Sequence, residues 1–294
     1  MAAASPSPCR KWRQLVVAWL VFAVVTRPVA ASMYDEVELT WGKEHSFFFM
    51  DGNDESGETL ALCLDEINGS GFASKDAYLY GRIDIDIKLV DGNSAGTVTT
   101  FYIIPDDVPW EQRDEIDFEF LGNVTGQPYT LHTNIFVNGV DHRVQQFKLW
   151  FDPSADFHTY SIEWNPKHII FLVDGVPIRD YKNAAAQGKP FPSWQHMRVH
   201  GTLWNADDWA TRGGRDKTDW KQAPFYAYYR NLRVKPCVPS PGVSWCGAEP
   251  PESTWFDQGA AETAAAVQSA REHLIYDYCR DPTVEDKFKE ECSF

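Results

Sequence analysis

Residues 114–120 read Asp-Glu-Ile-Asp-Phe-Glu-Phe, a strict alternation of carboxylates and large apolar side chains. Alternate side chains of a β-strand share one face, so this stretch predicts a strand with Glu115, Asp117 and Glu119 on the same side. The apolar side chains that we expect to point into the interior are Ile116, Phe118 and Phe120. Their packing would fix the strand, and the strand would then hold the acids in place.

The chain around this stretch, from about 34 to 235, carries many other strand patterns. Residues 80–89 and 97–104 alternate apolar and polar side chains, and the run 169–173 is followed by Asp174-Gly175, which is typical of a hairpin turn. Turn-forming clusters rich in Gly, Asn and Asp separate the runs. No helix-strand alternation is present, so the pattern predicts an all-β fold, an antiparallel sandwich or barrel.

The composition changes after residue 236, where several prolines interrupt the chain. Residues 260–276 are Ala-rich and predict a helix, with Glu262 in its first turn and Arg271 in its last. We therefore divide the chain into a sandwich domain at 32–235 and a C-terminal extension at 236–294, formed by one helix and disulfide loops.

The N-terminal residues 1–31 have the pattern of a secretory signal peptide. A basic segment at 9–13 precedes an apolar run at 15–25, and small residues follow at 29–31. The run is short of the ~20 residues that a membrane span needs, although a signal anchor is the alternative. We expect a secreted protein without a membrane segment after signal removal, from which Cys9 is lost.

Export permits disulfides, and four of the cysteines lie in the C-terminal extension. Four cysteines allow three pairings. The local pairings Cys237–Cys246 and Cys279–Cys292 are favoured, because each closes a short loop-rich stretch. Cys63 lies in an apolar strand pattern and is interpreted as a buried free thiol.

The overall charge limits the partners. The chain has 27 Lys and Arg against 42 Asp and Glu, a net charge of −15, which disfavours nucleic acid and anionic membranes. Abundant aromatic residues suit a neutral sugar ligand. No nucleotide motif, metal-ligand spacing or nucleophilic Ser/His arrangement is present, so no cofactor and no metal are expected. Asn68 and Asn123 begin glycosylation sequons, and Asn123 is the stronger candidate.

Repulsion between like charges makes it unfavourable for three carboxylates this close together to be ionised at once, so the pKa of one should rise. An ionised carboxylate beside a protonated one is the pair that glycoside hydrolysis uses. The outer Cα atoms of the line are ~13 Å apart in an extended strand. A retaining enzyme needs carboxyl groups ~5–5.5 Å apart, so the side chains must lean together or the strand must curve. A solvated acidic face and a calcium site are the alternatives.

The line and its surroundings resemble the plant xyloglucan endotransglucosylase/hydrolases of glycoside hydrolase family 16. The resemblance runs from about 34 to 292 and rests on residues 92–99, 114–123, 149–153, 156–161, 204–211 and 276–279 and on the four C-terminal cysteines. It implies a β-jelly-roll sandwich and a retaining mechanism with Glu115 as nucleophile, Asp117 as helper and Glu119 as acid/base. The implied reaction cuts xyloglucan and passes one half to another xyloglucan chain or oligosaccharide.

The same resemblance implies further substrate-binding residues, a monomer, and a place in the cell wall or apoplast. The implied binding residues are Asn123, His132, Thr133, Asn134, Arg143, Gln145, Asp208, Trp209 and Gly213. His132 and Asn134 alternate like the acids, which fits this role, although a structural polar row is the alternative. For Trp204 a core position is the favoured interpretation.

Several segments depart from the family pattern. The loop at 105–113 is longer than usual and ends in Arg113, where the family usually has His. Val144 stands where a Glu is expected, residues 199–202 replace a Ser-rich stretch, and 281–289 lack an Arg-Phe-Pro. Donor and acceptor preference are therefore open. A hydrolase of the same substrate and a weakly active glycan-binding protein remain alternative functions.

Overall fold

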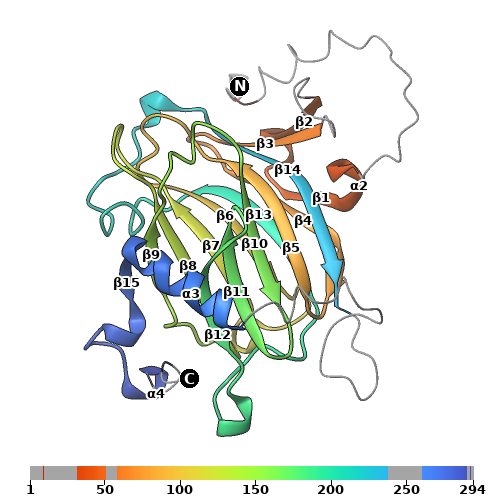
Figure 1. Cartoon of the computed structure of the whole chain (residues 1–294). Coiled ribbons are helices and arrows are strands. Elements are labelled where there is room, and N and C mark those ends of the chain that lie inside the picture. Colours follow the sequence, from red (N-terminus) through yellow and green to blue (C-terminus); the bar gives the residue numbers. More distant parts are fainter. Residues whose placement is uncertain (1–8, 10–31, 51–57, 238–259, 290–291, 293–294) are drawn as a thin grey trace.

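A computed structural model describes residues 9, 32–50, 58–237, 260–289 and 292, and shows two antiparallel sheets packed face to face (Figure 1). The first sheet has eight strands. In spatial order they are β1 (Val37–Trp41), β4 (Ser70–Tyr78), β13 (Met197–Asn205), β6 (Thr97–Ile104), β7 (Glu115–Leu121), β8 (Thr130–Phe136), β9 (Gln145–Lys148) and β15 (Leu274–Asp277). Strand β7, which carries the three acids, lies well inside this sheet.

The second sheet has seven strands. Their order is β12 (Val176–Lys182), β11 (His168–Val173), β10 (His158–Trp164), β5 (Gly81–Lys88), β14 (Phe225–Pro236), β3 (Glu58–Leu64) and β2 (Ser46–Met50). The predicted strands at 80–89 and 97–104 are confirmed as β5 and β6. The predicted hairpin is also confirmed, because Asp174 and Gly175 both adopt positive φ between β11 and β12. The all-β sandwich expected from the sequence is therefore present.

The apolar face of β7 lies in the core between the sheets. Phe118 stacks on Phe101 of β6 at 5.8 Å and meets Phe171 of β11 edge-on at 5.1 Å. Phe120 meets Tyr160 of β10 at 4.6 Å. Ring pairs of this kind contribute about 0.5–1.5 kcal/mol each beyond the burial of their area. The interior side of β7 is thus held from both sheets, which fixes the opposite, acid-bearing side.

The C-terminal extension differs from the prediction in one respect. The helix α3 (Ala260–Ala270) ends six residues earlier than the Ala-rich pattern suggests, and a 3₁₀ turn (Arg271–His273) follows. Residues Leu274–Asp277 instead form β15, which pairs with β9 and completes the edge of the first sheet. Backbone pairing at this open edge, together with apolar and aromatic side chains, outweighs helix propensity there.

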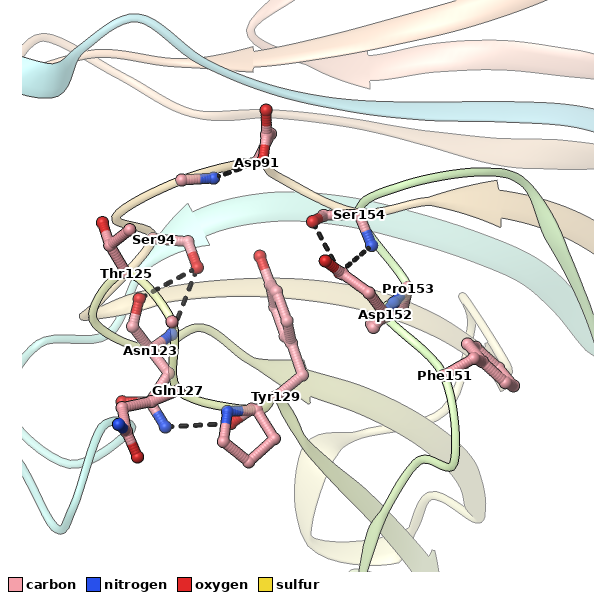
Figure 2. A pocket seen from close by; sticks show the side chains of 13 residues that line it. Asp91, Ser94, Asn123, Thr125, Gln127, Tyr129, Phe151, Asp152, Pro153 and Ser154 are labelled. Atoms are coloured by element: carbon pink, nitrogen blue, oxygen red, sulfur yellow. Dashed lines mark hydrogen bonds between the residues drawn. The ribbon is translucent and has the colours of Figure 1, made fainter.

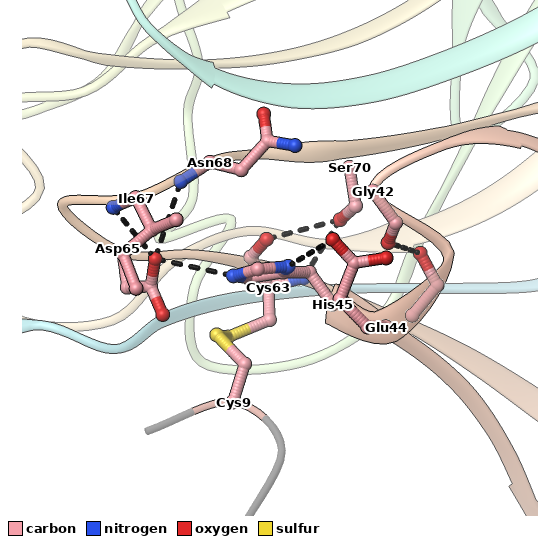
Figure 3. Close-up of a disulfide and its surroundings, with 10 residues drawn as sticks. Cys9, Gly42, Glu44, His45, Cys63, Asp65, Ile67, Asn68 and Ser70 are labelled. Atoms are coloured by element: carbon pink, nitrogen blue, oxygen red, sulfur yellow. Dashed lines mark hydrogen bonds and ion pairs between the residues drawn. A yellow bond between two sulfur atoms is a disulfide. The ribbon is translucent and has the colours of Figure 1, made fainter. Parts of the chain in front are cut away.

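The disulfides confirm one sequence prediction and correct another. Cys279 is bonded to Cys292, as predicted. Cys237 is also disulfide-bonded, but Cys246 lies outside the described residues, so that pairing stays a prediction. Cys63 is not the buried free thiol that the sequence suggested, because it is bonded to Cys9 (Figure 3). The sequence interpretation placed Cys9 in a removed segment, which left Cys63 without a partner.

The remaining helical elements are short, and the chief ones are α2 (Met33–Glu36) and α4 (Asp286–Lys289). Within the described ranges, no helix has the length and apolar character needed to cross a membrane. Apart from Cys9, the predicted signal segment 1–31 lies outside the described residues. Cys9, His45 and Asp65 form the one potential metal-ligand cluster found among the described residues, but the sulfur of Cys9 is already bonded to Cys63.

Candidate active site

A cavity of about 590 Å³ opens on the outer side of the first sheet, which we call the cleft face. All three carboxylates of β7 line it. The other lining residues come from β1, β6, β8 and β13 and from three loops, and they are Trp41, Thr100, Tyr102, Ile104, Trp110, Arg113, His132, Asn134, Phe136, Asp141, Val144, Thr202, Trp204 and Trp209. Carboxylates in a cavity with aromatic walls suit a carbohydrate ligand better than a charged one.

Strand register places a polar neighbour beside each central acid. Asp117 lies opposite Asn134 of β8 on one side and Tyr102 of β6 on the other. Glu119 lies opposite His132 of β8, and its carboxylate is 3.6 Å from Nε2 of that ring. Directly opposite residues of an antiparallel pair share one face. The row of acids is therefore flanked on both sides by side chains that also face the cavity.

Glu115 and Asp117 act as a coupled pair. Burial raises the pKa of both carboxyls, and the negative charges of Glu115 and Glu119 raise that of Asp117 further. A hydrogen bond between the pair lowers the pKa of Glu115 and raises that of Asp117, and the Arg113 guanidinium also lowers that of Glu115. The proton of the pair therefore stays on Asp117, and the protonated Asp117 donates a hydrogen bond to the ionised carboxylate of Glu115. Among the described residues, Oε2 of Glu115 has no hydrogen-bond partner.

Glu119 has a different environment. Burial, and then the charge of Glu115, raise the pKa of Glu119 to about 7. Burial and the Arg179 guanidinium lower the pKa of the neighbouring His132 to about 4, so that ring is neutral and gives Glu119 no cationic partner. The site thus holds one carboxylate poised as an anion, Glu115, and one poised to give and take a proton, Glu119.

Comparison with known proteins agrees with this arrangement. The family described as "Glycosyl hydrolases family 16" matches residues 33–222. This chain belongs to glycoside hydrolase family 16. Among its relatives, "Xyloglucan endotransglucosylase/hydrolase 2" of Glycine max is 50% identical over 267 residues, which cover 91% of this chain and 90% of the relative. "Xyloglucan endotransglucosylase protein 7" of Diospyros kaki is 49% identical and covers 85% and 92%.

Solved structures of the family 16 fold are also similar. An apo Crh5 transglycosylase superposes with a TM-score of 0.55 at 22% identity and covers 85% of this chain and 90% of its own. A Bacillus licheniformis β-glucanase superposes with a TM-score of 0.51 at 23% identity and covers 70% and 95%. At such identities the likeness establishes the fold alone, which is the jelly-roll sandwich expected from the sequence.

Of the substrate-binding residues predicted on β8 and β9 of this family 16 chain, some face the cavity and others do not, according to their alternation along the strand. His132 and Asn134 lie on the cleft face, whereas Thr133 is fully buried and bonded to Arg179 of β12. Gln145 lies opposite Thr133 and bonds to Asp277 of the extension. The prediction that Thr133 binds substrate is therefore wrong, and Gln145 lies outside the cavity lining.

Two neighbouring assignments also change. Arg143 is 1% exposed, and it donates to the backbone carbonyls of Ile135 and Val140, so the expectation that it binds substrate is wrong. Gln146 lies opposite His132 on the cleft face, and its side-chain amide is 3.3 Å from that ring. Gln146 of β9 therefore contacts the neutral ring beside Glu119, although it too lies outside the cavity lining, and sequence reasoning missed it.

The loop after β13 contributes one of its three predicted residues. Trp209 lines the cavity and meets the His132 ring edge-on at 6.3 Å. Asp208 is exposed, and Gly213 adopts a φ of 68° in open surroundings, but neither lines the cavity. Trp204, for which the sequence favoured a core position, lies in the cavity wall. Tyr102 and Thr100 were also missed, although the alternation in β6 could have indicated them.

Asn123 lines a separate pocket of about 430 Å³ at the end of the sandwich, as Figure 2 shows. Its side-chain amide donates to the Pro128 carbonyl at 2.9 Å, and its backbone N–H donates to Ser94 Oγ at 3.1 Å. Asn123 is therefore not part of the catalytic cavity. Asn68, the other sequon residue, is exposed on a turn, where its backbone N–H donates to Asp65.

Proposed function

We propose that this chain cleaves the β-1,4-glucan backbone of xyloglucan by a retaining double displacement and transfers the glycosyl group to another xyloglucan chain or oligosaccharide. The observation that carries the proposal is the row of three acids in one aromatic-walled cavity, with Glu115 as the anion and Glu119 near pKa 7. The names of the relatives, which are about 50% identical over most of both chains, support xyloglucan as the substrate.

In the first half-reaction, the unpartnered oxygen of Glu115 attacks the anomeric carbon of the bound sugar. Glu119, in its protonated form, donates its proton to the glycosidic oxygen as the bond to that carbon breaks. The leaving half of the polymer departs with a new hydroxyl group, and a covalent glycosyl-enzyme ester remains on Glu115.

In the second half-reaction, Glu119 is ionised and accepts the proton of an incoming hydroxyl group. That hydroxyl attacks the anomeric carbon, the ester bond to Glu115 breaks, and Glu119 returns to its protonated form. Two inversions at the same carbon give net retention. A xyloglucan hydroxyl gives transfer, and water gives hydrolysis.

Asp117 acts through Glu115. As a buried, protonated acid it donates a hydrogen bond to Glu115, which stabilises the carboxylate before attack and as the leaving group in the second half-reaction. This role needs no change in the charge of Asp117 during the cycle.

The setting of the enzyme is part of the proposal. We propose export through the 1–31 segment, whose removal would take Cys9 away and leave Cys63 as a buried thiol in the mature enzyme. We also propose glycosylation at Asn123 and at the exposed Asn68, and action as a monomer in the cell wall or apoplast. We also propose 32–235 as the catalytic domain and 236–294 as its extension. The net charge of −15 supports a neutral polysaccharide as partner rather than nucleic acid or an anionic membrane.

The proposal is tested with glycosylated protein, xyloglucan and a labelled xyloglucan oligosaccharide. We expect the label to enter the polymer, because the oligosaccharide competes with water for the glycosyl-enzyme. Shortening of the polymer without incorporation would show hydrolysis. Absence of both, with other β-glucans also inert as donors, would contradict the proposed reaction. A Glu115→Gln variant is the matched control, and it should lose turnover while retaining its fold.

A further inference from the structure

The connection between β6 and β7 forms one wall of the catalytic cavity and is anchored at both ends. Near its start, Asp106 pairs with Arg198 of β13, and its other oxygen is 3.3 Å from the ring of His200. Near its end, the buried Gln195 side chain donates to the Gln112 carbonyl at 2.8 Å and accepts from the Asp114 N–H at 2.9 Å. These bonds give the wall a fixed position.

Within this fixed wall, Arg113 has hydrogen-bonding capacity that the protein does not use. Its Nη2 donates to the Val108 carbonyl at 3.2 Å, and its guanidinium lies 4.8 Å from the centre of the Trp110 ring. Its Nε is buried, and neither Nε nor Nη1 has an acceptor among the described residues. A guanidinium carries five N–H donors, and a buried donor without an acceptor is costly. These donors therefore indicate an acceptor that a ligand supplies.

The position of Arg113 identifies that ligand. Arg113 precedes Glu115 by two residues, lines the same cavity, and lowers the pKa of Glu115 through its charge. It therefore acts on the side of Glu115 that faces away from Glu119. Trp110 is 56% exposed, lines the cavity beside it, and meets Phe136 edge-on at 6.4 Å. An exposed ring held between a guanidinium and a second ring offers a flat face for a sugar.

We propose that Arg113 is a substrate-binding residue whose free N–H groups donate to an oxygen of the sugar that becomes bonded to Glu115, with Trp110 contacting the same glycan. This rests on the proposed function, because it takes the ligand of the cavity to be a xyloglucan chain. Arg113 would then determine how the donor is held, and an enzyme with another residue here would hold it differently.

Two simpler roles compete with this one. Arg113 could act only through its charge on Glu115, or only as a support for Trp110. Binding measured in a Glu115→Gln background separates them from the proposal, since no carboxylate remains at residue 115 for the charge to stabilise. In that background, Arg113→Met removes all donors, whereas Arg113→Lys keeps the charge but loses the planar fork. Trp110→Ala removes the ring and leaves the guanidinium.

The experiment measures calorimetric binding of a xyloglucan oligosaccharide to these Glu115→Gln proteins, with thermal melting as a check of the fold. We expect Arg113→Met to weaken binding about tenfold or more, and Arg113→Lys to recover only part of it. In proteins with Glu115 intact, Arg113→Lys should lower kcat/KM while the acidic limb of the pH profile stays in place. The matched control is Arg233→Met, because Arg233 is on the second sheet and pairs with Asp86.

Unchanged binding in Arg113→Met would overturn the inference, and so would full recovery of binding and rate in Arg113→Lys. A third outcome would also overturn the inference. Trp110→Ala would weaken binding as much as Arg113→Met, and the double variant would lose no more than either. Arg113 would then act only as a support for Trp110. If the parent enzyme turned over no β-glucan but bound the oligosaccharide through Arg113, the inference would stand and the proposed reaction would fail. If no β-glucan bound, both would fail.

Discussion

The carboxylate of Glu119 lies 3.6 Å from Nε2 of His132, its direct cross-strand neighbour, and that ring is held neutral. A cationic neighbour would favour the ionised form of Glu119 and lower its pKa. Because the neighbouring ring is neutral, it does not offset burial and the charge of Glu115, which keep the pKa of Glu119 near 7. The acid/base role that we propose for Glu119 thus depends on the protonation state of His132 beside it.

The pH dependence of the reaction follows from the two outer acids. Glu119 must be protonated in the first half-reaction, so kcat/KM should fall as pH rises through about 7. Glu115 must be ionised, and because its pKa is raised, the acidic limb should lie above the usual value of 4.5. A Glu119→Gln variant should lose about 10²–10⁴-fold in kcat and lose the limb near pH 7. A limb that persists in this variant would assign it to another group.

Removal of the His132 ring should move that limb. In His132→Ala, water reaches Glu119, the cost of its ionisation falls, and its pKa drops toward 4.5. The basic limb should therefore shift to lower pH, as measured by kcat/KM from about pH 4 to 9. His273→Ala, in the extension, serves as the control and should leave the limb in place. A shift to higher pH would mean that His132 had been stabilising the ionised form of Glu119.

Substitutions at Asp117 test the hydrogen bond to Glu115. Asp117→Asn keeps a donor at this position, so we expect a loss in kcat of about tenfold, while Asp117→Ala leaves Glu115 without it and should lose about 10²–10³-fold. Rates with a labelled xyloglucan oligosaccharide give the comparison. Equal losses in the two variants would show that Asp117 has another role.

Glu163 of β10 predicts a stability effect far from the cavity. It is 3% exposed, and burial raises its pKa to about 7 from 4.5. Between these two values the folded state binds a proton more tightly than the unfolded state, so this group makes stability fall as pH rises from 4.5 through 7. Glu163→Gln removes the dependence and should raise the free energy of unfolding above pH 7, by at most on the order of 3 kcal/mol. Denaturant unfolding at pH 4.5 and pH 8 tests this, and an equal effect at both would contradict it.

The C-terminal disulfide should stabilise the edge of the first sheet. Cys279 and Cys292 close a loop of 13 residues next to β15, which pairs with β9. Replacement of both by Ser should lower the free energy of unfolding by about 3 kcal/mol, chiefly because the unfolded chain gains freedom. Thermal melting of the variant and of the parent protein, both without a reducing agent, would check this, because a reducing agent would also cleave the other disulfides. An unchanged melting temperature would show that the extension adds nothing to the stability of the sandwich.

Features that depend on local patterns, such as the face on which a side chain lies, could be predicted from the sequence. Features that depend on which strands pair could not. Alternation in β7 was enough to place Glu115, Asp117 and Glu119 on one face, because the intervening apolar residues admit one orientation only. In β9, parity could have excluded Gln145, which shares a face with the buried Phe147, but only the register with β8 shows that Gln146 meets His132. Likewise, the predicted helix included residues 274–276, which instead belong to β15 and pair with β9 at the open edge of the first sheet.

The cysteines illustrate the same limit over a longer range. The pairing of Cys279 with Cys292 is local and was predicted, whereas Cys63 bonds to a residue 54 positions away. No pattern around Cys63 indicates such a partner. The cavity walls contributed by Tyr102, Trp41 and Trp204 were missed for a related reason, because these residues meet only when β6, β1 and β13 align in one sheet.

The most direct test of the mechanism is to trap the covalent intermediate. A Glu119→Ala variant, which lacks the acid/base, is incubated with a xyloglucan oligosaccharide that carries an activated leaving group and is then digested for mass spectrometry. We predict a glycosyl adduct on the peptide that contains residues 114–120, with fragmentation placing it on Glu115. An adduct on another residue, or release of product with inverted configuration and no adduct, would contradict the retaining mechanism through Glu115.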